Sequence, residues 1–358
     1  MTRLLSAADE AAALEQLHAA GCTDGLPVII PTVERVARMV LASGLDGDIV
    51  LGEMGPQRGA ATVENVAIAA VMAGCLPDYM PVVVAAIRAV CQPEFDLAEM
   101  QGTTHCIAPL IIVNGPARAE CGGIHSGFGV FGPGHRANAS IGRALRLAML
   151  NIGGARPGES DMALHGSPAK FTFCCAEDEE HSPFPPLHTS FGYAPAASVV
   201  TVLGTEAPHS VLFSGDADDP TSPERWLNTV AAVIANPGSN NTHLGGTAAV
   251  CVVLNPEHAA VMAQGGYTRE MIQQALCERA VTPRAQLEAL NPRMLVGDED
   301  HIPAVRDPKN ILIMTAGGPG LYTMVMPSWS AGPHGNVAVH QAIELGQFCE
   351  LPATVSSA

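Results

Sequence analysis

Four short apolar runs, rich in β-branched residues and each ending at a turn, most constrain how this chain can fold. They are residues 110–113, 199–203, 250–254 and 311–314. Continuous apolar runs of this length are typical of strands that are buried on both faces. Because helical patterns lie between the runs, the sequence predicts an α/β fold with mixed or parallel buried sheets and flanking helices.

Start and stop residues delimit the helices. Thr32 is a good N-cap, Ser222 followed by Pro223 is a good helix start, and Gly44 is a good stop. The predicted helices span residues 6–20, 32–44, 63–73, 82–90, 136–150, 222–235 and 268–280.

A similar small-residue or acidic turn follows each apolar run, which allows two related halves joined near residues 193–197. We therefore expect an N-terminal α/β half, residues 1–195, and a C-terminal α/β half, residues 196–358. The alternative is that these are ordinary turns with no shared function. In α/β folds ligands bind in the crevice beyond the strand ends, so these turns are the first place to look for a site.

Composition excludes several classes of protein. The 358 residues are 47% hydrophobic and 15% charged, and the net charge is -17. Such a chain buries enough apolar surface to fold, and it repels nucleic acid and anionic membranes. No apolar run approaches the ~18 residues of a membrane span, and the ten cysteines are too sparse for a disulfide framework. We expect a cytoplasmic protein, and the large apolar content favours a homo-oligomer.

A glycine-rich loop at residues 126–134 leads into the helix predicted from Arg136. Backbone N–H groups at Gly129 and Gly132 and the helix start can bind an anion, with Arg136 and Asn138 as further contacts. The loop does not follow a strand directly, so we expect no nicotinamide or flavin cofactor. A purely structural loop is the alternative.

The segment from residue 170 to 183 is the densest reactive cluster. If residues 170–174 form a strand, Lys170 and Cys174 share one face, and the ammonium would favour a thiolate. Glu177 would orient the lysine or act as a base. The alternative is that Cys174 and Cys175 are core residues and that the acidic stretch is a solvated turn.

Thirteen histidines gather near the predicted turns. His105 directly precedes the first apolar run and is our candidate for proton transfer. No compact zinc motif is present, so we expect no metal. A metal held by distant loops, for example by His125, His135 and Cys174 or Glu177, is the alternative.

Two further turns supply candidate substrate contacts. Gly317 and Gly318 follow the last apolar run, where consecutive N–H groups can form an oxyanion hole. Asn114 ends the first run and adds an amide. The alternative is a tight connection into a core strand.

Five motifs together resemble a bacterial group of proteins of similar length. They are Thr-Asp-Gly-Leu-Pro-Val at 23–28, Asn-Gly-Pro at 114–116, Gly-Val-Phe-Gly-Pro-Gly at 129–134 followed by Arg-Ala-Asn, Cys-x-Ala-Glu at 174–177 and Ala-Gly-Gly-Pro-Gly at 316–320. The resemblance covers most of the chain. It implies a large companion of small proteins that carry Cys or selenocysteine in a UGSC motif, and hence a two-component enzyme with thiol or selenol chemistry.

The sequence thus predicts a hydrolase or lyase that cleaves a C–N or C–S bond of a small anionic substrate, with Cys174 as nucleophile. Lys170, Glu177 and His105 complete the predicted catalytic set. One alternative is a metal-dependent hydrolase or lyase with His, Cys and Glu ligands. Another is a non-catalytic subunit that binds a small Cys-containing partner.

Overall fold

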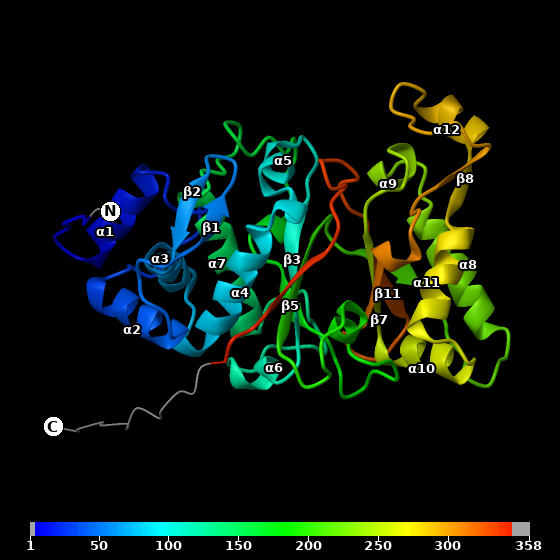
Figure 1. Ribbon diagram of the computed structural model, residues 1–358, viewed down its shortest axis with the longest axis horizontal. Coiled ribbons are helices and arrows are strands. Elements are labelled where there is room, and N and C mark those ends of the chain that lie inside the picture. Colours follow the sequence, from blue (N-terminus) through cyan, green and yellow to red (C-terminus); the bar gives the residue numbers. More distant parts are fainter. Residues whose placement is uncertain (1–3, 346–358) are drawn as a thin grey trace.

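Two four-stranded sheets face each other between two layers of helices (Figure 1). The computed structural model describes residues 4–345. The first sheet has the order β12-β5-β3-β4, with β3 (Ala108–Asn114), β4 (Cys174–Ala176), β5 (Val199–Thr205) and β12 (Val339–Ala342). The second has the order β10-β7-β11-β6, with β6 (His209–Leu212), β7 (Val250–Leu254), β10 (Ile311–Thr315) and β11 (Tyr322–Met326). This confirms the predicted α/β fold with mixed sheets and flanking helices.

The helices lie outside the sheets. On the first sheet pack α4 (Met80–Val90) and α7 (Arg136–Asn151), and against these pack α2 (Val33–Ser43) and α3 (Val63–Ala73). On the second pack α8 (Ser222–Ile234), α10 (Pro256–Gln264) and α11 (Arg269–Arg279). The remaining elements are α1 (Glu10–Ala19), β1 (Val50–Met54), β2 (Gly59–Thr62), η1 (Pro77–Tyr79), η2 (Pro93–Phe95), α5 (Leu97–Gly102), α6 (Ala117–Glu120), η3 (Pro168–Lys170), η4 (Leu187–Phe191), α9 (Asn240–His243), β8 (Val281–Pro283), α12 (Arg284–Leu290), β9 (His301–Pro303) and η5 (Pro308–Asn310).

Alternate side chains of the strands enter different cores, which explains the continuous apolar runs. In β3, Ile111 and Val113 pack against the helices, whereas Leu110 and Ile112 pack between the sheets. The strands β7 and β10 divide in the same way between the inter-sheet core and the core beneath the second helical layer. A strand with both faces buried has no position for a solvated polar residue.

The two sheets are built with the same topology. In each sheet, the chain passes from a central strand (β3 or β7) through helices to a parallel strand at the edge (β4 or β10). It then forms an antiparallel strand (β5 or β11), which pairs with the other side of the central strand. The next strand then crosses to the opposite sheet, so that β6 pairs with β11 and β12 pairs with β5. The molecule therefore has two topologically equivalent halves that exchange their last strands.

Because of this strand exchange, the two halves do not divide at the boundary that the sequence suggested. Both β5 and β12 lie in the sheet of β3 and β4, although the predicted boundary at residue 195 assigns them to the second half. The last equivalent strand of the first half is β6, so the halves meet between residues 212 and 250. The end of the predicted second domain, residues 346–358, lies outside the described residues.

Candidate functional site

The two ends of the sheets carry different polar clusters. The carboxyl ends of β3, β4, β7 and β10 lie at one edge, near α6 and α10 in Figure 1. The start of these strands and the ends of β5 and β11 lie at the opposite edge, near α5 and α9. Because β3 has seven residues, the two edges are about 20 Å apart.

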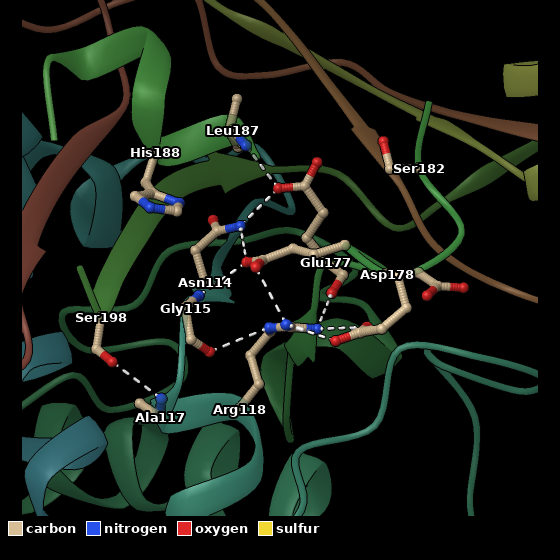
Figure 2. Close-up of polar contacts among 12 residues, drawn as sticks. Asn114, Gly115, Ala117, Arg118, Glu177, Asp178, Ser182, Leu187, His188 and Ser198 are labelled. Atoms are coloured by element: carbon tan, nitrogen blue, oxygen red, sulfur yellow. Dashed lines mark hydrogen bonds and ion pairs between the residues drawn. The ribbon is translucent and has the colours of Figure 1, made fainter. Parts of the chain in front are cut away.

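The first group, which we call the carboxyl-edge cluster, consists of Asn114, Arg118, Glu177, Glu179, His188 and Arg269. Figure 2 shows four of these side chains: Asn114, Arg118, Glu177 and His188. Glu177 is fully buried, and one of its oxygens accepts from Asn114 Nδ2 at 2.5 Å and from the Leu187 N–H at 2.6 Å. Its other oxygen lies 3.3 Å from Arg269 Nη2. Burial raises the pKa of Glu177, while Arg269 and the two donors oppose that rise. The carboxylate thus has its partners within the protein.

Figure 2 also shows how this cluster ties the chain together. Glu179 accepts from Asn114 and from the Gly115 N–H, and it forms an ion pair with Arg118. Arg269 begins α11 of the second half, whereas Glu177 follows β4 of the first. Asn114 and Glu177, which the sequence analysis considered separately, lie close together here, but the contacts of the cluster join the two halves and leave few polar atoms for a ligand.

The glycine loop and the Gly317 turn do meet, at the same edge. The Gly317 N–H donates to the Ser126 carbonyl at 2.7 Å, and the Phe128 ring covers Gly318 so closely that a side chain there would require the ring to move. Within the loop the Gly132 N–H donates to the Gly129 carbonyl at 2.7 Å. The Gly132 and Gly317 N–H groups therefore already have backbone acceptors and are not free to bind the predicted anion.

The two polar residues after the loop also have structural partners. Arg136 donates through Nε and Nη2 to the Gly74 carbonyl, at 3.2 and 3.0 Å. Asn138 is buried, accepts from the His125 N–H at 2.8 Å and donates to the His125 carbonyl at 2.9 Å. Asn138 therefore holds the start of the loop against α7, whereas Arg136 ties the start of α7 to the end of α3.

Cys174 and Lys170 do not form the predicted pair. Pro168 starts the short helix η3, so Lys170 is not in a strand, and β4 begins only at Cys174. Lys170 instead forms an ion pair with Asp161, Nζ to Oδ1 2.6 Å. Cys174 points into the core beneath α4 and α7, where burial raises the pKa of its thiol. The geometry therefore offers no activated thiolate at Cys174, and burial likewise raises the pKa of Cys175 between the sheets.

A second group lies at the opposite edge, and we call it the amino-edge cluster. Its members are Gln101, His105, Thr205, Glu206, His243, Ser328, Ser330 and Asn336. Within residues 4–345, eleven buried side-chain nitrogen and oxygen atoms have no hydrogen-bond partner, and seven of them belong to these residues. Because a buried polar atom without a partner is costly, such a concentration indicates that ordered water or a bound ligand satisfies these atoms.

Backbone contacts bring the members of the amino-edge cluster together from both halves. Thr205 and Ser328 form an isolated antiparallel bridge where the two crossing segments meet. The Ser328 N–H donates to Asn241 of α9 at 2.9 Å, and Asn336 Nδ2 donates to the Gly204 carbonyl at 2.8 Å. The cluster therefore lies between the sheets, at the junction of the two halves.

The backbone near this cluster is strained. Among the described residues other than glycine, four have a positive φ, and three of these lie here: Asp96 at 55°, Ser330 at 53° and Asn336 at 56°. Asp and Asn adopt the left-handed region more readily than other non-glycine residues, so the strain is clearest at Ser330, and residues in this region gather at functional sites. Asp96 is also held, since its carboxylate lies 2.7 Å from His334 Nδ1.

His105 and Glu206 form the reactive pair of the amino-edge cluster. His105 Nε2 lies 2.9 Å from Glu206 Oε1, and the side chains are 17% and 32% exposed. The imidazole Nδ1 is buried and has no partner among the described residues. A carboxylate only accepts hydrogen bonds, so it selects the tautomer with hydrogen on Nε2 and a free lone pair on Nδ1.

Sequence reasoning identified His105 but missed its partners. Thr205 ends β5, Glu206 follows it, and Ser328 comes after β11, at an edge where the strand-end rule for parallel sheets does not apply. The one available signal was local polarity, in the Asn-Asn-Thr-His run at 240–243 and the Ser-Trp-Ser run at 328–330.

Comparison with protein family models, with curated proteins and with solved structures found no match. The resemblance to the companions of UGSC-type proteins therefore stays a prediction. In the described part of the chain, no three or more His, Cys, Asp or Glu side chains form a group that could hold a metal ion. No described helix is both long and apolar enough to cross a membrane.

Proposed function

We propose that the protein is a hydrolase or lyase that acts on a small polar substrate by general acid–base catalysis at the amino-edge cluster. The observation that carries this proposal is the His105–Glu206 pair, which leaves His105 Nδ1 without a partner at the edge of the sheets where the other partnerless polar atoms of the amino-edge cluster lie. A positioned imidazole whose other nitrogen is held by a carboxylate is a common general base.

The pair can move a proton in both directions. In hydrolysis, His105 Nδ1 takes a proton from water, and the resulting hydroxide attacks the carbon of the C–N bond. Glu206 stabilises the imidazolium that forms, since its oxygen already lies 2.9 Å from Nε2. The imidazolium then returns the proton to the leaving nitrogen. In a lyase the same nitrogen would take a proton from carbon, and it would return that proton to the leaving group.

The surrounding side chains suit a polar substrate that is held by several weak contacts. The hydroxyls of Thr205, Ser328 and Ser330 can donate or accept, and the free Nε2 of Gln101 donates. Such donors can stabilise the negative charge that develops on a substrate oxygen. The proposal uses no cysteine nucleophile, because Cys174 is buried in an apolar core.

The test is a screen of the purified protein against small amides, esters and thioethers, followed by variants on the best substrate. His105→Gln should lower kcat/KM by about 100-fold or more, which is the usual contribution of a general base. Glu206→Gln should also lower it, because the amide no longer stabilises the imidazolium.

A matched control is available in His181→Gln. His181 also lies 2.9 Å from a carboxylate, that of Asp178, but its side chain is 72% exposed at the other edge of the sheets. This variant should retain the wild-type rate. Wild-type turnover in His105→Gln would contradict the proposal.

A further inference from the structure

The outer face of α2 carries an apolar stripe that the described chain leaves uncovered. Its two large members, Val33 and Leu41, are 69% and 66% exposed, and the exposed Ala37 lies between them. Because these residues are spaced by four positions, they form one ridge along the helix. Among the described helices, α2 is the only one with two exposed large apolar side chains, whereas α11 and α12 have one each, Met271 and Leu290.

Further apolar surface adjoins the start of α2. Ile29, four residues before Val33, is 49% exposed, and its N–H donates to the Met72 carbonyl of α3. Leu76 is 38% exposed and directly precedes η1, which packs against α2. A stable interface buries about 800 Å² on each partner, which is more than one short helix offers, so these neighbours enlarge the surface. Figure 1 shows α2 at the outer end of the first half, so the patch is separate from the amino-edge cluster.

The charged residues beside the stripe can pair with a second copy of the chain. Glu34 and Arg38 are exposed and lie one helical turn apart, and neither forms an ion pair within the described chain. With Arg35, α2 bears one acidic and two basic side chains, although the net charge of the whole chain is -17. The helix therefore lacks the excess of negative charge that makes copies of this chain repel each other.

We infer that the protein forms a two-fold dimer in which the exposed faces of α2 from two copies pack antiparallel, with Ala37 at the crossing point. A two-fold axis at this residue brings Leu41 of each copy against Val33 of the other, and the small Ala37 side chains let the helices approach closely. The same axis places Glu34 and Arg38 of the other copy about 3 Å apart along the helix axis, since the rise is 1.5 Å per residue. One surface thus supplies both sides of the contact.

An exchange of charges tests this arrangement. Sedimentation velocity should give the wild-type protein twice the mass of the chain. Glu34→Arg and Arg38→Glu each bring like charges together at both ends of the interface, so each should raise the dimer Kd by about tenfold or more. An equimolar mixture of the two variants should restore the dimer. One copy then has arginine at both positions and the other has glutamate at both, so every pair attracts.

A further variant tests the apolar stripe. Leu41→Asp should raise the dimer Kd by about a hundredfold or more, because the symmetry removes the side chain from both copies. Since Leu41 is mostly exposed, the variant should keep its fold, which urea unfolding checks. The matched control is Met271→Asp on α11, where the side chain is 48% exposed. This control should leave the dimer unchanged.

Other results would overturn the inference. A wild-type protein that stays monomeric at micromolar concentrations would do so without any variant, and a different protein would then cover this face. A dimer that all three α2 variants leave intact would place the interface elsewhere. A mixture of two monomeric charge variants that stays monomeric would contradict the antiparallel register. None of these measurements needs turnover, so they are independent of the proposed function.

Discussion

Glu177 and Arg269 form an ion pair that is almost completely buried and that joins the two halves of the molecule. The carboxylate of Glu177 is 0% exposed and the guanidinium side chain of Arg269 is 3% exposed. Arg269 also donates through Nε to the Ile313 carbonyl of β10 at 3.0 Å. The pair therefore fixes the end of β4 against α11 and β10, at the edge opposite the proposed site.

Removal of the cation from this pair should strongly destabilise the protein. Arg269→Met leaves Glu177 buried and without its counter-charge, which typically costs about 3–5 kcal/mol. The free energy of unfolding in urea measures this cost. The more exposed Arg279–Glu224 pair is the control, since Arg279→Met should cost no more than about 1 kcal/mol. Equal losses in the two variants would show that the buried pair has no special role.

A second ion pair makes stability depend on pH. Asp24 forms two hydrogen bonds of 2.8 Å with Arg143 of α7. Burial raises the pKa of Asp24, but the hydrogen bonds and the charge of Arg143 outweigh burial, so the pKa lies below its usual value. The stabilisation is therefore complete above the unfolded pKa of about 3.9, and it is lost as the pH falls through the folded pKa.

Asp24→Asn should accordingly lower the unfolding free energy at pH 7 by about 1.5–3 kcal/mol, the usual range for a hydrogen bond to a charged group. The difference from wild type should shrink below about pH 4, as both proteins lose the charged pair. Thermal unfolding between pH 2.5 and 7 measures it. The exposed Asp48 is the control position, because Asp48→Asn should follow the wild-type curve. A difference that does not change with pH would contradict this account.

The cysteines should differ in their reaction with iodoacetamide. Cys174 and Cys175 are 4% and 0% exposed, and burial raises the pKa of both thiols, so neither should be alkylated in the native protein at pH 8. Cys22 is half-buried and should react. Mass spectrometry of peptides gives the extent at each position, and unfolding in urea should make all of them reactive. Rapid native alkylation of Cys174 would restore it as a candidate nucleophile.

Local patterns predicted most of the elements. The prediction for β7 matches the strand exactly, that for α3 matches the helix exactly, and Thr32 accepts from the Arg35 N–H as an N-cap should. These features depend on residues that are close in sequence: the spacing of apolar residues indicates a helix or a strand, and capping side chains mark where a helix begins. The condition that residues 170–174 form a strand is not met, because Pro168 begins a helical turn that includes Lys170.

The candidate site was harder to predict, because it depends on pairing between distant residues. His105 and Glu206 are 101 positions apart, and they meet only because β5 lies antiparallel to β3. The strand exchange that brings Ser328 to Thr205 leaves no periodic signal in the sequence. In β4, the alternation of side chains along a strand predicts that Cys174 and Cys175 lie on opposite faces. Both faces of β4 are buried, and the sequence pattern alone does not reveal this, so it could not exclude a thiol that opens into a pocket.

The central claim is that Glu206 holds His105 in the tautomer whose Nδ1 can accept a proton. Long-range ¹H–¹⁵N NMR of histidine-labelled protein measures this directly, with the His105 signals assigned by their loss in His105→Gln. At a pH where the ring is neutral, we predict hydrogen on Nε2 and the ¹⁵N shift of an unprotonated Nδ1, with a mixture of tautomers in Glu206→Gln. Hydrogen on Nδ1 in the wild-type protein would contradict the claim.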